Sequence, residues 1–327
     1  MLSKTVRLIF GVGMLLTGFA ANAQGLPQLR IGLSSSSFAT AATRAARELG
    51  LFQEEGIDAR LVVMDTASAA TTALISKSLD LVLSGPGELI VAQSRGQKII
   101  VLANLYNGHS TSLVLSKSVA DNIKVAPDAP IRERLKALNG LLIATTSATS
   151  ASTISLRTAV KDAGSELRAT YMNQAAMSAA LESGAIQGYL ASAPFWASPV
   201  VRRSGVLWIS GPKNDLPAEY TPVSSGQVQT TRDFAQNNPL VVEKIKRVYA
   251  RFARVLEERP ADVKAAIAKM YPDLDAATLD LLFTLESPAW KTKPLSEDDM
   301  AREIVFVKNN GAPLPGIDAI SPASLLP

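Results

Sequence analysis

An alternation of short apolar strands with helices, which occurs twice along the chain, most constrains the fold. In the first half, segments rich in Val, Ile and Leu predict strands at 29–33, 59–64, 79–83 and 98–103. Helical segments separate them, and one begins at Pro86 and ends near Gly96, residue types that suit a helix start and end. Uninterrupted apolar strands between helices predict a parallel sheet covered on both faces.

The same alternation restarts after the Pro-rich segment 127–130. It predicts a second α/β unit with strands at 141–145, 168–171, 186–191 and 206–209, and helices near 151–163, 174–183 and 195–203. The segments 111–116 and 223–230, which link the two units, both favour an extended conformation. Because two segments connect two units, we expect one unit to be inserted in the other.

The end of the chain is helical. Five apolar residues there share one face at helical spacing: Val241, Ile245, Val248, Phe252 and Val255. We expect this face to pack on the first unit. A chain of this length exceeds what one hydrophobic core organises. The predicted fold class is therefore α/β, with two lobes and a ligand cleft between them. Lobe 1 would comprise 24–116 and 224–327, and the inserted lobe 2 would comprise 117–223.

Residues 1–23 predict a signal peptide. Lys4 and Arg7 form a short positive segment, an apolar run follows at 8–20, and Ala-Asn-Ala at 21–23 matches the small-x-small cleavage pattern. The alternative, an uncleaved anchor, is disfavoured because the run has about 13 residues and a spanning helix needs ~20. We expect cleavage near Ala23 and export of the mature chain to the periplasm.

Cysteine content and charge narrow the class further. The chain has no Cys, which excludes disulfides, thiolate catalysis and a lipid anchor at the export site. An exported chain without disulfides fits a bacterial periplasm. Loss of Lys4 and Arg7 with the signal lowers the net charge from +4 to about +2, which is not the charge of a nucleic-acid-binding surface. We expect a monomer without a nucleic-acid partner.

Patterns for catalysis and metal binding are absent from the sequence. His109 is the single His, so a His-based metal cage cannot form and a Ser-His-Asp triad could use only this residue. The mature chain contains no G-x-S-x-G elbow, no G-x-x-x-x-G-K-[ST] loop and no G-x-G-x-x-G fingerprint. We therefore expect a protein that is not an enzyme and that needs neither cofactor nor metal.

Several hydroxyl-rich loops lie where a ligand would bind. Ligands of open α/β sheets bind beyond the carboxyl ends of the strands, where the next helices begin. First-turn N–H groups there lack intrahelical partners and carry partial positive charge, so they favour a carboxylate, a sulfonate or a similar anion. The loops at this edge supply the candidate ligand-binding residues: Ser35, Ser36, Ser37, Phe38, Thr66, Ser84, Gly85, Pro86, Tyr106, Asn107, His109, Thr146, Ser147, Thr149, Phe195 and Trp196.

Each of these residues also has a purely structural interpretation. Ser and Thr before a helix are ordinary N-caps, the aromatic residues could belong to the core, and a lone His is often structural. For any single loop the structural interpretation is favoured. For the set the binding interpretation is favoured, because the loops share one edge of the predicted sheet.

Three segments carry a resemblance to a known family. The segment ELGLFQEEGID at 48–58, followed by a strand, resembles the GLF-x-x-E-G signature of ABC-transporter solute-binding proteins. The branch is the nitrate/sulfonate/taurine type, which includes binders of thiamine pyrimidine precursors. KSLDL at 77–81 and GQKIIV at 96–101 are similar to the family's approaches to its third and fourth strands.

This resemblance implies a type II-like periplasmic binding protein that closes on its ligand and delivers it to a membrane permease. It places the site at the segments 35–38, 84–86, 106–109 and 146–149. The chain departs from the family at Gly188, where Asp is common, and at Ala193-Pro194, where Glu-Pro is common. Both departures remove negative charge near the expected cleft, which suits an anionic ligand.

The leading hypothesis is an uptake receptor for a small organic anion, with sulfonates and carboxylates ahead of nitrate. Two alternatives remain open at this point. One is a pyrimidine-precursor binder or biosynthetic protein of the same fold, and the other is a ligand-binding partner of a sensor.

Replacing Ser147 and Thr149 together with Ala is expected to weaken binding of the cognate ligand at least tenfold, or about 1.4 kcal/mol. The reason is that the two hydroxyls would supply donors at the start of the helix predicted near 151–163. Isothermal calorimetry measures the change, and an unchanged affinity would remove this loop from the site.

Overall fold

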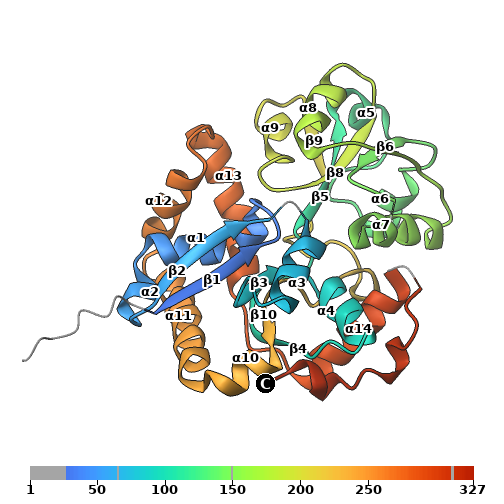
Figure 1. The fold of residues 1–327 in the computed structure, drawn as a ribbon. Helices are drawn as coiled ribbons and strands as arrows, with labels where there is room; N and C mark the ends of the chain where they lie inside the picture. Colours follow the sequence, from blue (N-terminus) through green and yellow to red (C-terminus); the bar gives the residue numbers. More distant parts are fainter. Residues whose placement is uncertain (1–26, 65, 149, 311–312) are drawn as a thin grey trace, which may run out of the picture.

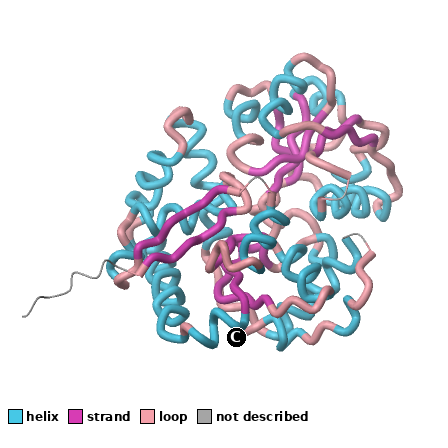
Figure 2. The backbone as a smooth tube through the Cα atoms, in the orientation of Figure 1, coloured by secondary structure: helices cyan, strands magenta, loops and turns pink. Residues whose placement is uncertain are grey.

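The computed structural model describes residues 27–64, 66–148, 150–310 and 313–327, so the predicted signal peptide lies outside the described residues. The chain forms two lobes, each built on one five-stranded sheet (Figure 1). Figure 2 shows the strands inside each lobe with helices around them. The predicted two-lobed α/β fold is therefore confirmed.

The sheet of the first lobe has the strand order β2-β1-β3-β10-β4. Its strands are β1 (Gln28–Leu33), β2 (Asp58–Val63), β3 (Leu81–Ser84), β4 (Ile99–Asn107) and β10 (Ser224–Thr231). β1 is parallel to β2 and β3, whereas β10 is antiparallel to both β3 and β4. The strands β1, β2 and β3 follow the predicted parallel pattern, with β3 fully buried.

The sheet of the second lobe has the order β7-β6-β8-β5-β9. Its strands are β5 (Thr111–Ser116), β6 (Leu142–Thr145), β7 (Arg168–Tyr171), β8 (Gly188–Ser192) and β9 (Gly205–Ile209). β6 is parallel to β7 and β8, and β5 is antiparallel to β8 and β9.

Both sheets are thus mixed, which corrects the prediction of parallel sheets. The antiparallel strands are β5 and β10, which are the two linking segments. Each comes from the other lobe and runs in the direction opposite to its neighbouring strands. The predicted boundary at 116 counted 111–116 with the first lobe, although these residues pair within the second sheet. We propose that the chain crosses between the lobes just before Thr111 and again just before Ser224.

Helices cover both sheets. Those of the first lobe are α1 (Ala41–Glu48), α2 (Leu51–Glu54), α3 (Ala67–Ile75), α4 (Pro86–Ser94), α10 (Arg232–Asn237), α11 (Pro239–Glu258), α12 (Pro260–Met270), α13 (Ala276–Glu286) and α14 (Glu297–Asn310). Those of the second lobe are α5 (Lys117–Asn122), α6 (Ile131–Lys136), α7 (Ala151–Asp162), α8 (Gln174–Glu182) and α9 (Ala197–Val201). Short 3₁₀ turns lie at Phe38–Thr40, Ala218–Tyr220, Ser287–Trp290, Ile317–Ala319 and Pro322–Leu325.

The long helix α11 shows how the C-terminal segment joins the first lobe. Of its predicted apolar face, Ile245, Val248, Phe252 and Val255 are buried, while Val241 is half-buried and its neighbour Val242 is buried instead. This face belongs to the same hydrophobic core as β1 and β4, so the predicted packing on the first unit is confirmed. Among the described residues, no helix is both long and apolar enough to span a bilayer.

Gly211 packs closely against the backbone segment by which the chain enters the second lobe. A Cβ at this position would overlap the carbonyl oxygens of His109 and Thr111. We expect Gly211→Ala to lower the free energy of unfolding by about 1–3 kcal/mol, because rigid backbone would have to shift. Urea unfolding measures this change.

The control is Gly87→Ala in the first turn of α4, where a Cβ would meet no atom within 4 Å. We expect this change to leave the free energy of unfolding unchanged or to raise it by up to about 1 kcal/mol, because Ala at a compatible helix position reduces the conformational entropy of the unfolded chain. An equal loss in both variants would contradict the steric explanation at Gly211.

Candidate functional site

A cleft of about 690 Å³ lies between the two lobes. Figure 1 places α3, α4 and α14 of the first lobe opposite α7 of the second. Helix starts and hydroxyl side chains form much of the wall of the cleft. The lining includes Ser68, Thr71, Gly85, Pro86, Glu88, Arg95, His109, Ser110, Ser150, Ser152, Ser225 and Phe306.

Two helices begin at this cleft, each with a hydroxyl side chain as its N-cap. Thr66 caps α3 by accepting a hydrogen bond from the Ala69 N–H (3.1 Å), and Ser150 caps α7 by accepting one from the Thr153 N–H (3.3 Å). Neither helix has an acidic residue in its first turn. The first-turn N–H groups of a helix have no intrahelical partners, so those of α3 and α7 present partial positive charge to the cleft, which favours an anion.

The helix α4 starts differently. Gly85 is its N-cap and Pro86 its first residue, and Glu88 lies in its first turn. A carboxylate there offsets the partial positive charge of the helix end. Of the three helix starts at the cleft, those of α3 and α7 thus lack a first-turn carboxylate that would weaken their attraction for an anion.

The predicted site residues divide between the cleft and other places. Gly85, Pro86 and His109 line the cleft, and Thr66 directly precedes two lining residues of α3. Ser147 accepts a hydrogen bond from the Ser150 N–H (3.1 Å), which places it beside the start of α7.

Other predicted loop residues have structural contacts. Thr146 is exposed next to Ser147, and Thr149 lies outside the described residues. Ser84 is buried, and its hydroxyl donates to the Glu88 carboxylate (3.4 Å). Asn107 donates to the Lys291 carbonyl (3.1 Å) and so ties the end of β4 to the C-terminal segment.

The serine loop after β1 lies at the junction of the lobes. The hydroxyls of Ser35 and Ser37 are 2.9 Å apart, and Ser36 is exposed with its carbonyl accepting from the Tyr271 hydroxyl (2.6 Å). The Phe38 N–H donates to the Ala193 carbonyl of the second lobe (3.2 Å). This loop therefore contacts both lobes.

Three of the four predicted aromatic residues are buried in packed contacts. Phe38 stacks on Tyr271 and Trp290, with ring centroids 5.0 and 5.9 Å apart. Tyr106 and Trp196 are also fully buried, whereas Phe195 is half-buried. None of these four aromatic side chains is among the residues that line the cleft.

Tyr106 and Trp196 converge on a carboxylate that sequence reasoning missed. The Tyr106 hydroxyl and the Trp196 indole N–H (3.1 Å) both donate to Glu286, the last residue of α13. Glu286 is fully buried, and burial raises its pKa to about 7. Because Trp196 belongs to the second lobe, this group holds the lobes together on the side of α9 and α13.

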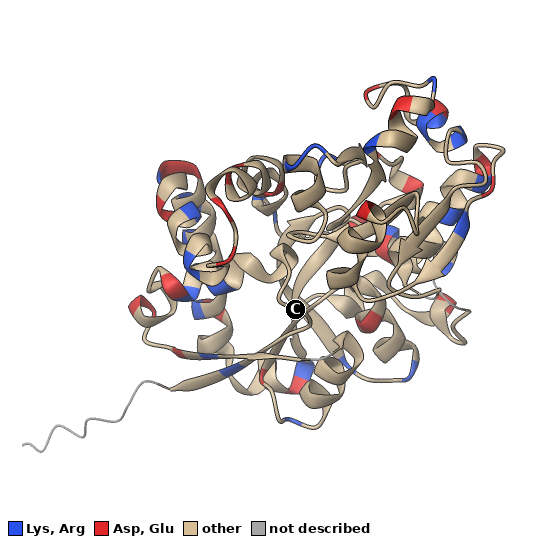
Figure 3. Cartoon of the chain, turned by 90° about the horizontal axis from the view of Figure 1, so that it is seen from above, with Lys and Arg blue, Asp and Glu red and all other residues tan. Residues whose placement is uncertain are grey.

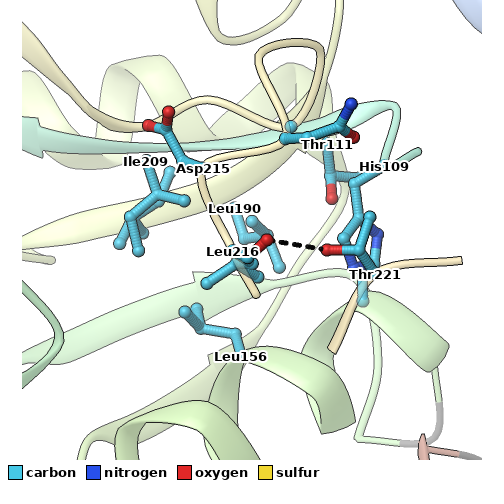
Figure 4. Close-up of a pocket in the computed structure, with 12 residues that line it drawn as sticks. His109, Thr111, Leu156, Leu190, Ile209, Asp215, Leu216 and Thr221 are labelled. Carbon is cyan, nitrogen blue, oxygen red and sulfur yellow. Dashed lines mark hydrogen bonds between the residues drawn. The ribbon is translucent and has the colours of Figure 1, made fainter. Parts of the chain in front are cut away.

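His109 lies between the cleft and a small cavity inside the second lobe. Its Nε2 is 2.7 Å from the Tyr220 carbonyl and 3.3 Å from the Ser155 hydroxyl. Figure 4 shows His109 and Thr221 on the side of this cavity opposite Ile209. The cavity volume is about 10 Å³, the space of one water molecule. Burial lowers the pKa of His109 to about 4, so it is neutral at pH 7.

Several cleft residues were outside the predicted set. Ser150 could have been identified as the N-cap of the helix near 151–163. Ser is a preferred N-cap residue, and its hydroxyl can accept a hydrogen bond from the N–H three residues later, which here is Thr153. Ser152 follows in the first turn of that helix. Ser225 comes from β10, far away in sequence, and no local signal marks it. Among the described residues, no cluster of His, Asp or Glu is arranged to hold a metal ion.

Comparisons with known proteins agree with this architecture. A model of the NMT1-like family matches residues 22–271, and no curated protein matches the chain. The periplasmic aliphatic sulphonate binding protein SsuA from Escherichia coli has a similar structure, with TM-score 0.67 and 18% identity over 91% of this chain and 98% of that one.

Two further structures share the fold. The alkanesulfonate-binding protein SsuA from Xanthomonas axonopodis pv. citri, bound to MOPS, has TM-score 0.64 and 18% identity over 89% of this chain and 97% of that one. The periplasmic nitrate-binding protein NrtA from Synechocystis PCC 6803 has TM-score 0.60 and 14% identity over 87% of this chain and 81% of that one. The family match confirms the predicted family resemblance, and the three solved structures show that the fold is shared.

Glu286 is expected to make folding stability depend on pH. Its pKa is about 7 in the folded protein against an ordinary 4.5, so between these values the folded protein holds a proton that the unfolded chain has lost. The free energy of unfolding therefore falls as the pH rises from about 4.5 to about 7. We expect the difference between wild type and Glu286→Gln to change by about 1–3 kcal/mol across this window.

Urea unfolding at several pH values measures this difference. The exposed Glu133→Gln provides the control, and its difference from wild type should show no comparable trend. A pH-independent difference between wild type and Glu286→Gln would contradict a proton held at Glu286.

Proposed function

Because the chain belongs to the NMT1-like family, we propose that it is the periplasmic substrate-binding component of an ABC importer. In this proposal, the protein captures a small organic anion, a sulfonate or a carboxylate, in the cleft between the lobes and delivers it to a membrane permease. The observation that carries the proposal is the pair of helix starts, α3 and α7, that face the cleft from opposite lobes without an acidic first-turn residue.

The charge distribution supports a small ligand over a large polyanion. Figure 3 shows Lys, Arg, Asp and Glu on the helices of both lobes. Arg95 is the one Lys or Arg residue in the lining of the described cleft. An anion bound there would be held mainly by neutral donors, the backbone N–H groups and hydroxyls of α3 and α7.

The connections between the lobes suit closure on a ligand. The Gly108 N–H donates to the Val223 carbonyl (3.1 Å), so the two crossing segments run side by side. The buried Glu303 of α14 accepts the Ser224 N–H (2.8 Å) and fixes the second segment to the first lobe. Rotation about these segments would bring α7 toward α3 and α4, and a ligand that binds the closed state better would shift the equilibrium.

A thermal-shift screen of the mature protein tests the ligand class. The panel contains alkanesulfonates, alkanoates, aromatic carboxylates, nitrate and pyrimidines. A ligand at 100 times its dissociation constant should add about 2.7 kcal/mol of stability. A shift with sulfonates or carboxylates, without turnover, is expected. A shift with pyrimidines alone would replace the proposal with a pyrimidine-binding role.

A charge placed at the start of α7 tests the position of the anion. We expect Ser152→Asp to weaken binding of the compound found in the screen at least tenfold, because its carboxylate would occupy the positive helix end. Calorimetry gives the affinity, and unchanged binding would move the anion away from α7.

Ser118→Asp is the matched control. Ser118 is exposed and is also the second residue of its helix, α5, which lies outside the cleft. Both substitutions complement a helix dipole and should leave the fold intact. Only Ser152→Asp is expected to affect binding.

A further inference from the structure

The two lobes are joined at a second place besides the crossing segments, where α9 of the second lobe packs on α13 of the first (Figure 1). The Trp196 indole N–H of the second lobe donates to the Glu286 carboxylate of the first (3.1 Å). The Phe38 N–H of the first lobe donates to the Ala193 carbonyl of the second (3.2 Å). Phe38 and Trp196 belong to one hydrophobic core that continues from lobe to lobe. The relative position of the lobes therefore depends on this contact as well as on the crossing segments.

A carboxylate lies at the centre of the contact. Glu286 is fully buried, and it accepts from the Tyr106 hydroxyl of the first lobe as well as from Trp196. It takes part in none of the ion pairs of the described residues. Two neutral donors offset the cost of a buried negative charge only in part.

Few titratable groups face Glu286 from the elements packed around it. α9 and the 3₁₀ turn that follows α13 contain none. Tyr106 faces it from β4 and Tyr271 from the end of α12, and Arg44 of α1 lies beyond, over the Tyr271 ring. On α13 itself, Asp280 is exposed. Burial is therefore the main influence on the protonation of Glu286, and it raises the pKa to about 7 although Tyr106 and Trp196 oppose the shift.

Separation of α9 from α13 would change this environment. Trp196 would leave with the second lobe and water would reach Glu286, so its pKa would return toward the ordinary 4.5. Between these two values, the joined lobes hold a proton that the separated lobes have lost. A fall in pH across this window favours the joined state, and a rise favours separation.

We infer that the contact between Glu286 and Trp196 joins the lobes in a proton-dependent way, stable when the carboxyl is neutral and weakened when it is charged. A neutral carboxyl still accepts from Trp196 through its carbonyl oxygen, and it can donate its own proton to the Tyr106 hydroxyl oxygen. It thereby keeps both contacts without a buried charge. The inference goes beyond the proposed function, because it concerns the protein without ligand.

The absence of Cys from the sequence makes the distance between the lobes measurable, since spin labels can be attached at two introduced thiols. Ala179→Cys on α8 and Ala277→Cys on α13 are suitable positions, because both residues are exposed and belong to different lobes. Double electron–electron resonance gives the label distances in the mature, ligand-free protein. We expect the ratio of separated to joined lobes to rise at least tenfold from about pH 5 to about pH 7.5.

Two variants of the contact sharpen the test. Trp196→Phe keeps an aromatic ring and removes the donor, so it should show a larger separated fraction than wild type at about pH 7.5. Glu286→Gln cannot ionise but still offers an acceptor to Trp196, so its label distances should not depend on pH.

Glu133→Gln, at an exposed first-turn glutamate of α6, is the matched control and should keep the pH response. Glu303, whose pKa burial raises to about 8, is still present in Glu286→Gln. A response caused by Glu303 would therefore persist in that variant. Thermal unfolding verifies that each variant is folded.

The outcomes are distinct from those of the ligand screen. If the label distances of wild type and Trp196→Phe are the same at both pH values, the inference is overturned, whether or not Glu286→Gln folds. If the pH response persists in folded Glu286→Gln, the assignment to Glu286 is overturned.

Discussion

The backbone hydrogen bond from Gly108 to Val223 joins the two segments that pass between the lobes, and the arrangement of the site depends on it. Because the segments are paired at this point, β5 and β10 enter opposite sheets close to one another. The helix starts that follow β3 and β6 then face each other across the cleft. A chain with the same strands and an unpaired crossing would constrain the relative position of these two edges less.

The two sides of this junction differ in chemistry. On the side of α9 and α13, Trp196 of the second lobe donates to the buried Glu286, and Phe38 stacks on Trp290 nearby. On the side of α4 and α7, hydroxyls and helix starts surround open space. One side therefore holds the lobes by packing and buried hydrogen bonds, while the other leaves room for a ligand. Buried polar groups with specific partners favour one lobe orientation over others.

Local sequence patterns predicted much of the fold. The apolar segments at 29–33 and 79–83 correspond to β1 and β3, and the periodic apolar face of α11 is buried with one exchange, Val242 for Val241. The mixed sheets were missed because strand direction depends on where the second lobe is inserted. A linking segment such as Ser224–Thr231 has the same extended character whether it runs parallel or antiparallel to its neighbours.

The candidate site was harder to predict for a related reason. The loops at Gly85 and His109 were expected at the cleft and do line it. Tyr106 and Trp196 were expected there too, but their partner Glu286 is 180 and 90 residues away along the chain. A single Glu in the apolar helix α13 could equally lie on a solvent-facing side of the helix, so the sequence did not predict that Glu286 is buried.

The closeness of Gly108 and Val223 has a consequence for how such a molecule can be rearranged. The chain leaves the first lobe and returns to it at one point, so the second lobe is an insertion whose two ends are adjacent. A short turn could bridge those ends with little entropic cost of closure. A different domain with adjacent ends could be inserted at this point, provided that it also covered the buried Glu286 that Trp196 contacts in this chain.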